Sequence, residues 1–391
     1  MNYFDDSSVN LDVLKKRAFN YRWAEVEEDI IPLTAADPDF PVAPQIIEAL
    51  KEYLDGGYLS YTPKLGLPEF RQSLAKNLGS RKGFNISADL VLPIDSAARG
   101  MYIIAQAILK PGDEMIVFDP VDYLFKQACL SASGKPVLFP AKLSNGRIDL
   151  SNLESYITPK TKMIGLCNPH NPLGTVYTFE DLDHILTLAE KYDLWIMNDE
   201  IWSDIIFGEA KFTSILSLGA ERNKKTLSVY GLSKSFGVAG LRIGCVYCHD
   251  KEIFDHIVDV SGVMTTAGGI TSLSQIAGIA ALEKCFPWVE QFIAHLTRNR
   301  DYALSRIEAM PGIKCHTPQS TYLLFPDITE TGMNSQEFCE FVEKNARLAL
   351  VPGTEKFFGP GAEGHVRICF ATSRGILTQG MDRLEKALTL L

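Results

Sequence analysis

Short apolar runs alternate with amphipathic stretches through the middle of the chain. Turn residues bound these runs, which cover residues 89–94, 114–119, 136–140, 162–167, 194–199, 226–231 and 241–248. Between two of them, residues 178–193 place apolar side chains at helical spacing, and Thr178 with Asp181 predicts a capping box. Near-continuous apolar strands separated by helices predict an α/β fold with a largely parallel sheet covered on both faces.

The pattern changes near residue 285. A long helical stretch is followed by short strand-like pieces at 321–326 and 365–371 and by two more helical segments. We therefore expect a smaller α+β domain over residues 285–391 and a large domain over 46–284. Residues 1–45 are expected to form an irregular arm that contributes to the small domain.

Composition and charge exclude several classes of function. The chain has 391 residues and a formal net charge of -10, which argues against a nucleic-acid partner bound through its phosphates. No apolar run approaches the roughly 18 residues of a membrane span, and the first residues lack the order of a signal peptide. The eight cysteines are scattered, which favours free thiols, no metal site and a cytoplasmic location.

Polar and small residues follow the predicted strands, at the sheet edge where ligands bind in open parallel sheets. Lys234 is notable because it is a charged amine between two serines in an apolar and glycine-rich stretch. A desolvated lysine is a nucleophile toward carbonyl groups, whereas a lysine in a surface turn is only solvated. The residues expected at this edge are Ser96, Ala97, Ala98, Tyr123, Asn171, Asp199, Ser233 and Lys234.

This set of residues suits pyridoxal 5'-phosphate. The small residues from Ser96 to Ala98 precede a predicted helix, whose free N–H groups would bind a phosphate. Asp199 ends an apolar strand, where its carboxylate would pair with a pyridinium nitrogen; the alternative is a helix N-cap.

The order of several motifs resembles the class I/II (aspartate) aminotransferase family of fold-type I pyridoxal-phosphate enzymes. The matching segments are ADPDFP (36–41), YTPKLGLPEFR (61–71), LKPGDEMIVFDP (109–120), NPHNPLG (168–174), NDEIWSD (198–204), LSKSFGVAGLRIG (232–244), VPG (351–353) and HVRICFATSR (365–374). The resemblance implies the fold-type I architecture and the family's cofactor, and it covers most of the chain.

The resemblance also implies a role for individual residues. Lys234 would carry the cofactor covalently and act as general base and acid, with Ser233 beside it. Asp199 would pair with the pyridine nitrogen, Asn171 would donate to the phenolic oxygen, and Arg242 would bind the phosphate.

Two further roles follow from the same resemblance. Tyr61 would reach the phosphate of a neighbouring subunit, which implies a homodimer with shared active sites. Arg367 would bind the substrate's α-carboxylate, to which a guanidinium offers two parallel hydrogen bonds.

The sequence departs from the family pattern at several positions. Trp202 replaces the tyrosine three residues after the aspartate, and Gly231 replaces a serine. The stretch Ser96 to Ala98 lacks one usual hydroxyl. The aromatic residue that stacks on the ring is replaced by Asp122, so that Tyr123 would take this role only if the loop shifts by one residue.

Three functions are consistent with these residues. The first is transamination between an L-amino acid and a 2-oxo acid. The second is β-elimination, as in cystathionine β-lyase-like enzymes, which AADPDF (35–40) and DEIWSDIIF (199–207) also resemble. The third is a non-catalytic binding protein that keeps the fold. A nicotinamide enzyme is disfavoured because no G-x-G-x-x-G follows the first strand.

Overall fold

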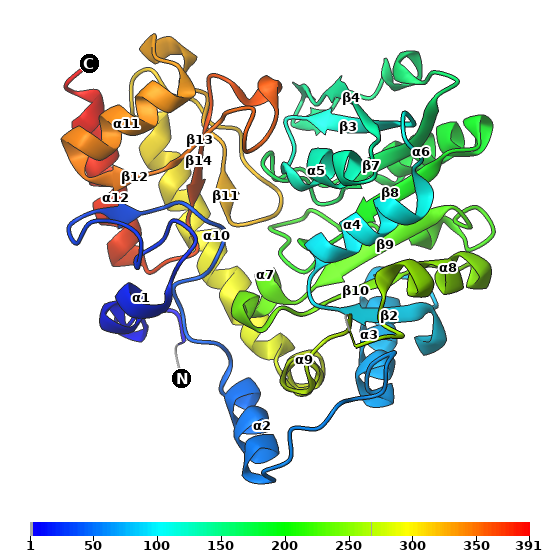
Figure 1. Ribbon diagram of the computed structural model, residues 1–391. Helices are drawn as coiled ribbons and strands as arrows, with labels where there is room; N and C mark the ends of the chain where they lie inside the picture. Colours follow the sequence, from blue (N-terminus) through cyan, green and yellow to red (C-terminus); the bar gives the residue numbers. More distant parts are fainter. Residues whose placement is uncertain (1–2, 267) are drawn as a thin grey trace.

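A mostly parallel sheet forms the centre of the molecule. The computed structural model describes residues 3–266 and 268–391. Within these residues the central sheet has seven strands in the order β2-β10-β9-β8-β7-β3-β4 (Figure 1). The strands are β2 (Val91–Ile94), β10 (Gly244–Tyr247), β9 (Thr226–Gly231), β8 (Trp195–Asp199), β7 (Thr161–Cys167), β3 (Glu114–Asp119) and β4 (Lys135–Pro140). All neighbours from β9 to β4 are parallel, while β10 is antiparallel to both of its neighbours.

The expected α/β class is therefore confirmed, with one antiparallel strand as an exception. Strands β3 and β9 have the bounds that the apolar pattern predicts. Strand β10 is shorter than the predicted run 241–248 because Ala239–Leu241 form a single turn of 3-10 helix and Arg242 adopts a left-handed backbone with φ of 54°.

Helices cover the sheet. Helix α4 packs on β8, β9 and β10, and both α5 and α8 pack against α4. Helix α6 has the predicted capping box between Thr178 and Asp181, and it buries Leu182 and Ile185. These helices are α4 (Ala97–Ile108), α5 (Leu124–Ser131), α6 (Phe179–Tyr192) and α8 (Lys251–Ser261).

The carboxyl-terminal residues form a helical layer with small sheets, on the left of Figure 1. Its three-stranded sheet has the order β11-β14-β13, and β1 from the amino-terminal arm pairs in parallel with β12. The elements are α1 (Leu11–Arg17), β1 (Ile31–Pro32), α10 (Phe286–Glu308), β11 (Leu323–Leu324), α11 (Ser335–Ala346), β12 (Leu348–Ala349), β13 (Val351–Pro352), β14 (Val366–Cys369) and α12 (Arg374–Leu388).

The remaining helices connect these two parts. Helix α9 contacts α2, α3 and α10, at the bottom of Figure 1. These helices are α2 (Pro44–Asp55), α3 (Pro68–Lys82), α7 (Ser233–Phe236) and α9 (Ser272–Lys284). Strands β5 (Leu143–Ser144) and β6 (Arg147–Ile148) form a separate short hairpin. None of the helices in the described part of the chain has both the length and the apolar character that crossing a bilayer requires.

Candidate active site

The predicted residues gather where the central strands end. Asp199 is the last residue of β8, and β9 leads directly to Ser233 and Lys234 at the start of α7. Strand β2 runs parallel to β9, because both are antiparallel to β10, so Ser96 lies at the same edge of the sheet. Parallel topology therefore brings these side chains to one side, as expected.

Lys234 is partly buried and has no carboxylate bonded to it in the described residues. Its Nζ donates a hydrogen bond to the backbone oxygen of Ala36 at 2.6 Å, and it lies 5.4 Å from the centre of the Trp202 ring. Burial lowers the pKa of Lys234, although Asp37 opposes this effect. A lysine with a lowered pKa reaches its neutral, nucleophilic form more easily.

Asp199 is a buried carboxylate, and no cation of the described residues is bonded to it. Its Oδ1 accepts a hydrogen bond from the backbone N–H of Ile201 at 3.0 Å, in a turn and not at a helix start. Burial raises the pKa of Asp199 to about 7, and Asp122 adds to this effect. A pyridinium N–H beside this carboxylate would give it the partner it lacks.

Asn171 is hydrogen-bonded to Asp122, the carboxylate whose charge adds to the pKa shift of Asp199. The Nδ2 of Asn171 donates to Oδ2 of Asp122 at 2.8 Å, while its Oδ1 is buried without a partner. Trp202 is 2% exposed and meets the ring of Tyr322 edge-on, with 4.7 Å between the ring centres. Trp202 therefore forms an apolar wall beside Lys234.

Ser96 and Arg242 meet at the start of α4. Ser96 is the N-cap of α4, because its Oγ accepts from the backbone N–H of Arg99 at 3.1 Å, and it also accepts from Nη2 of the exposed Arg242 at 2.9 Å. A Cβ at Gly244 would lie 2.5 Å from the backbone nitrogen of Ala97, so only glycine lets β10 approach the helix this closely. The helix N-terminus and a cation together suit a phosphate, and Ala97 and Ala98 add no bulk.

Arg367 projects from β14 of the carboxyl-terminal layer. Its Nη2 makes a long 3.5 Å contact with the backbone oxygen of Thr34, and its buried Nε has no partner in the described residues. Burial lowers the pKa of Arg367, with Asp122 as the first opposing charge. A buried guanidinium with a free N–H is suited to bind a carboxylate.

Two predicted residues are exposed to solvent. Tyr61 is 93% exposed, in a segment over residues 56–64 that is mostly exposed. Tyr123 is 44% exposed, and its backbone N–H donates to the oxygen of Phe357 at 3.1 Å. Burial raises the pKa of the Tyr123 phenol, and the charge of Asp122 adds to this effect while that of Arg367 opposes it.

The amino-terminal arm supplies contacts that the sequence did not predict. Lys234 and Tyr322 both donate to the backbone oxygen of Ala36, and Asp37 acts on Lys234. Thr34 contacts Arg367 through its backbone. The sequence marked this arm only through ADPDFP (36–41), a segment that matches the family pattern but to which no role was assigned.

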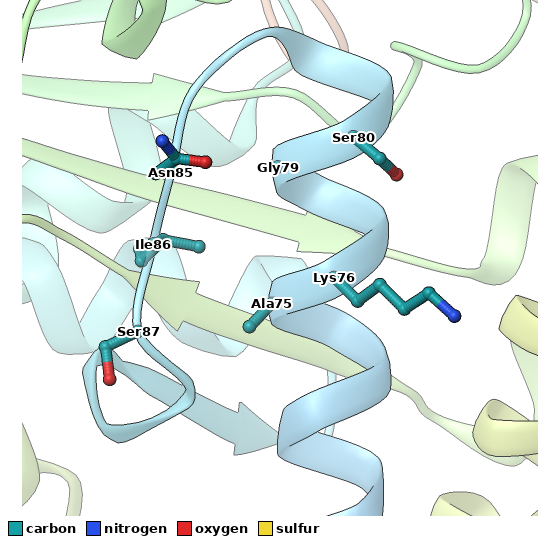
Figure 2. A pocket seen from close by; sticks show the side chains of 7 residues that line it. All are labelled: Ala75, Lys76, Gly79, Ser80, Asn85, Ile86 and Ser87. Carbon is teal, nitrogen blue, oxygen red and sulfur yellow. The ribbon is translucent and has the colours of Figure 1, made fainter.

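A pocket elsewhere in the molecule contains none of these residues. It has a volume of about 580 Å³ and lies between α3 and the segment that follows it (Figure 2). Its lining residues are Ala75, Lys76, Gly79, Ser80, Asn85, Ile86 and Ser87. With one charged side chain among them, they offer no group of catalytic residues.

Comparisons with known proteins agree with this geometry. Residues 28–384 match the family described as aminotransferase class I and II. The chain is 33% identical to an aspartate aminotransferase of Pyrococcus horikoshii, over 99% of this chain and 97% of that protein.

Two solved structures are similar over nearly the whole chain. An aromatic aminotransferase of Pyrococcus horikoshii superposes with a TM-score of 0.87 at 32% identity, covering 93% of this chain and 97% of that one. Cystalysin of Treponema denticola, which contains pyridoxal 5'-phosphate, superposes with a TM-score of 0.91 at 26% identity, covering 100% and 99%. The chain belongs to the class I and II aminotransferases, which are pyridoxal-phosphate-dependent enzymes of fold type I.

Proposed function

We propose that this chain transfers an amino group between an L-amino acid and a 2-oxo acid, with Lys234 as the catalytic residue. The observation that carries the proposal is that one sheet edge presents both Lys234 and Asp199. Burial lowers the pKa of the Lys234 amine, and no cation of the described residues is bonded to the buried Asp199 carboxylate. The amine suits the covalent attachment of the cofactor, and the carboxylate suits its ring nitrogen.

The residues at the sheet edge would hold pyridoxal 5'-phosphate. Asp199 would accept a hydrogen bond from the ring nitrogen, and Asn171 has a second amide hydrogen to donate to the phenolic oxygen. The N-terminus of α4 with Ser96 and Arg242 would hold the phosphate. Ser233, Ala97, Ala98, Tyr123 and Trp202 would complete the cofactor site. When bound, the cofactor supplies an electron sink that makes the substrate's α-proton acidic.

Lys234 and Arg367 would act on the substrate. The guanidinium of Arg367 binds the α-carboxylate through its free Nε–H and so orients the α-carbon toward Lys234. The Nζ of Lys234, in its neutral form, would take the α-proton as a general base. The protonated Nζ would then act as the general acid that donates a proton before the 2-oxo acid is released. Asn171 borders the same space and would contact the substrate as well.

We also propose that the protein works as a homodimer in which Tyr61 reaches the partner's phosphate site. Support comes from Tyr58, Leu59 and Tyr61, which are 82%, 62% and 93% exposed in one chain. Large apolar side chains that gather on a surface are typical of an interface. Sedimentation should give twice the chain mass, and Tyr61→Ala should weaken cofactor binding; a monomer with full activity would contradict this part of the proposal.

The proposed domain division keeps residues 46–284 as the cofactor-binding domain and 285–391 as the small domain, with residues 1–45 as an arm. The pairing of β1 with β12 supports placing the arm with the small domain. A cytoplasmic location is part of the proposal because all eight cysteines are free. Limited proteolysis and cell fractionation test these two statements.

Carbon-sulfur β-elimination is the second candidate function. The superposition on cystalysin over the full length of this chain favours it. A single experiment separates the two candidates: the enzyme is incubated with amino acids, with and without a 2-oxo acid, and with cystathionine or cysteine. Transamination requires the 2-oxo acid, whereas release of thiol, pyruvate and ammonia without a 2-oxo acid would overturn the proposal.

A further inference from the structure

Asp122 is the charged residue of the site that the proposed function leaves without a role. It follows β3 and precedes α5, at the position where the family resemblance leads us to expect an aromatic residue. Its Oδ1 accepts from the backbone N–H of Leu124 at 3.1 Å and its Oδ2 accepts from Nδ2 of Asn171 at 2.8 Å. Its own N–H donates to the backbone oxygen of Asn171 at 3.1 Å. Two hydrogen bonds therefore fix the carboxylate, and a third fixes the backbone of the same residue.

Asp122 lies within electrostatic reach of the two residues that would hold the substrate. Burial raises the pKa of Asp122, and the positive charges of Arg367 and Lys234 oppose this effect and favour the carboxylate. Because the α-carboxylate would bind to Arg367 and the α-carbon would face Lys234, the substrate side chain begins between these two groups. Asp122 borders that space.

Two unpartnered buried atoms indicate that a ligand completes this space. Oδ1 of Asn171, which is 4% exposed, and Nε of Arg367 have no hydrogen-bond partner in the described residues. Buried polar atoms are normally paired, so these two are suited to a bound molecule. Both belong to residues that adjoin Asp122 through a hydrogen bond or through its charge.

The balance of charge then favours one class of substrate. The substrate's α-carboxylate neutralises Arg367, and Lys234 must be uncharged to accept a proton, so neither cation remains for Asp122. Asp37 adds a second carboxylate near Lys234, and its other cation, Arg22, already forms a buried ion pair with Asp39. A buried charge without a partner is costly.

We propose that Asp122 is a specificity-determining residue that favours amino acids with a positively charged side chain and disfavours amino acids with a second carboxylate. This inference rests on the proposed function. A cationic amino or guanidino group would restore the charge balance, whereas a second carboxylate would face Asp122 and Asp37. At an effective dielectric constant of about 20, a charge reversal across a few ångströms changes affinity by about tenfold or more.

The test compares kcat/KM of the holoenzyme for ornithine, lysine and arginine with that for aspartate and glutamate. We expect at least a tenfold preference for the cationic substrates, and at least a tenfold loss of this preference in Asp122→Asn, whose amide oxygen still accepts from Asn171. The matched control is Asp119→Asn, because Asp119 ends β3 only three residues before Asp122 but its charged neighbours are Glu355 and Lys126. This control should leave the preference unchanged.

A binding measurement gives an independent readout. Calorimetry with δ-aminovalerate and glutarate, two carboxylates of equal chain length that lack an α-amino group, should show tighter binding of δ-aminovalerate to the wild-type holoenzyme. If Asp122→Asn does not fold, this comparison on the wild type and on Asp37→Asn still decides the matter.

Three results would overturn the inference. They are a preference of the wild type for dicarboxylates, tighter binding of glutarate, and an equal loss with all substrates in Asp122→Asn, which would mean that Asp122 acts only through Asn171. The proposed function fails separately, if no amino acid of either class transfers its amino group.

Discussion

Two buried carboxylates stand next to each other on the chain, and their surroundings differ. Glu200 is 0% exposed and is fully hydrogen-bonded. Its oxygens accept from Lys82 at 2.8 Å, from Tyr247 at 2.8 Å, from Ser214 at 2.6 Å and from Asn198 at 2.9 Å. Both oxygens of this carboxylate therefore have two partners each, and one of these four partners is a cation, as a buried charge requires.

Asp199 faces the opposite situation. It is also buried, yet its one hydrogen bond among the described residues comes from a backbone N–H. Around it, Oδ1 of Asn171 and Nε of Arg367 have no partner in the same residues, and Lys234 is bonded to a single backbone oxygen. The difference indicates that bound molecules provide the partners that Asp199 lacks, whereas the carboxylate of Glu200 is satisfied by protein groups alone.

The largest effect is expected for Lys234→Ala. The change removes both the covalent attachment of the cofactor and the group that moves the α-proton, so kcat should fall by about 10⁴-fold or more. Thermal unfolding of the cofactor-free protein should change little, because Lys234 has few bonds to lose. Activity within tenfold of the wild type would show that another residue does this work.

Lys82→Met tests the surroundings of Glu200, the second carboxylate of the comparison. It leaves Glu200 without its cation in a buried position, which should lower the free energy of unfolding by about 3–5 kcal/mol. Denaturant titration measures this loss. The kcat of the remaining folded holoenzyme should stay within a few-fold of the wild type; a large fall in kcat at unchanged stability would mean that the cluster belongs to the active site.

Asp199→Asn should reduce kcat by about 10²–10³-fold, the size expected when one preorganised electrostatic partner is lost. The amide cannot balance a pyridinium charge, so cofactor affinity should fall as well, as a spectral titration would show. Asn in place of Asp keeps the acceptor for Ile201, so the fold should be retained. Unchanged cofactor affinity would contradict the assigned role.

Arg367→Lys should raise KM for the amino-acid substrate by about tenfold or more while changing kcat less. A lysine cannot make the two parallel hydrogen bonds that a guanidinium offers to a carboxylate. Steady-state kinetics at varied amino-acid concentration measure this split. Arg300→Lys is the control, since Arg300 forms its ion pair with Asp301 on the same helix.

The smallest effect concerns pH. In the cofactor-free protein, burial raises the pKa of Asp199 to about 7 from 3.8. The stability that its bound proton contributes is fully present below the ordinary pKa and is lost as pH rises through about 7. The Tm of Asp199→Asn relative to the wild type should therefore increase from pH 5 to 7 and then level off, and a difference that does not vary with pH would contradict the shift.

The sheet could be predicted from the sequence because its signal is local. Strand β3 is a continuous apolar run between turn residues, and its predicted bounds match the structure. The start of β10 could not be placed, since a left-handed backbone at a non-glycine residue such as Arg242 leaves no signal in the apolar pattern.

The site was only partly predictable for the same reason. Lys234 and Asp199 follow strands whose order brings them to one edge, and this rule needs no coordinates. The sequence marked Asp122 as a departure but gave no means to see its hydrogen bond to Asn171, because the two residues come from different loops. The contact of Ala36 with Lys234 joins residues almost 200 positions apart in sequence, and no local pattern encodes it.

The central claim is that the crevice around Lys234 and Asp199, and not the polar cluster around Glu200, binds the cofactor. The most direct measurement is borohydride reduction of the holoenzyme followed by peptide mass mapping. Our account predicts that the cofactor is fixed to Lys234 alone. A label on the buried Lys82, on any other lysine, or on none would contradict it.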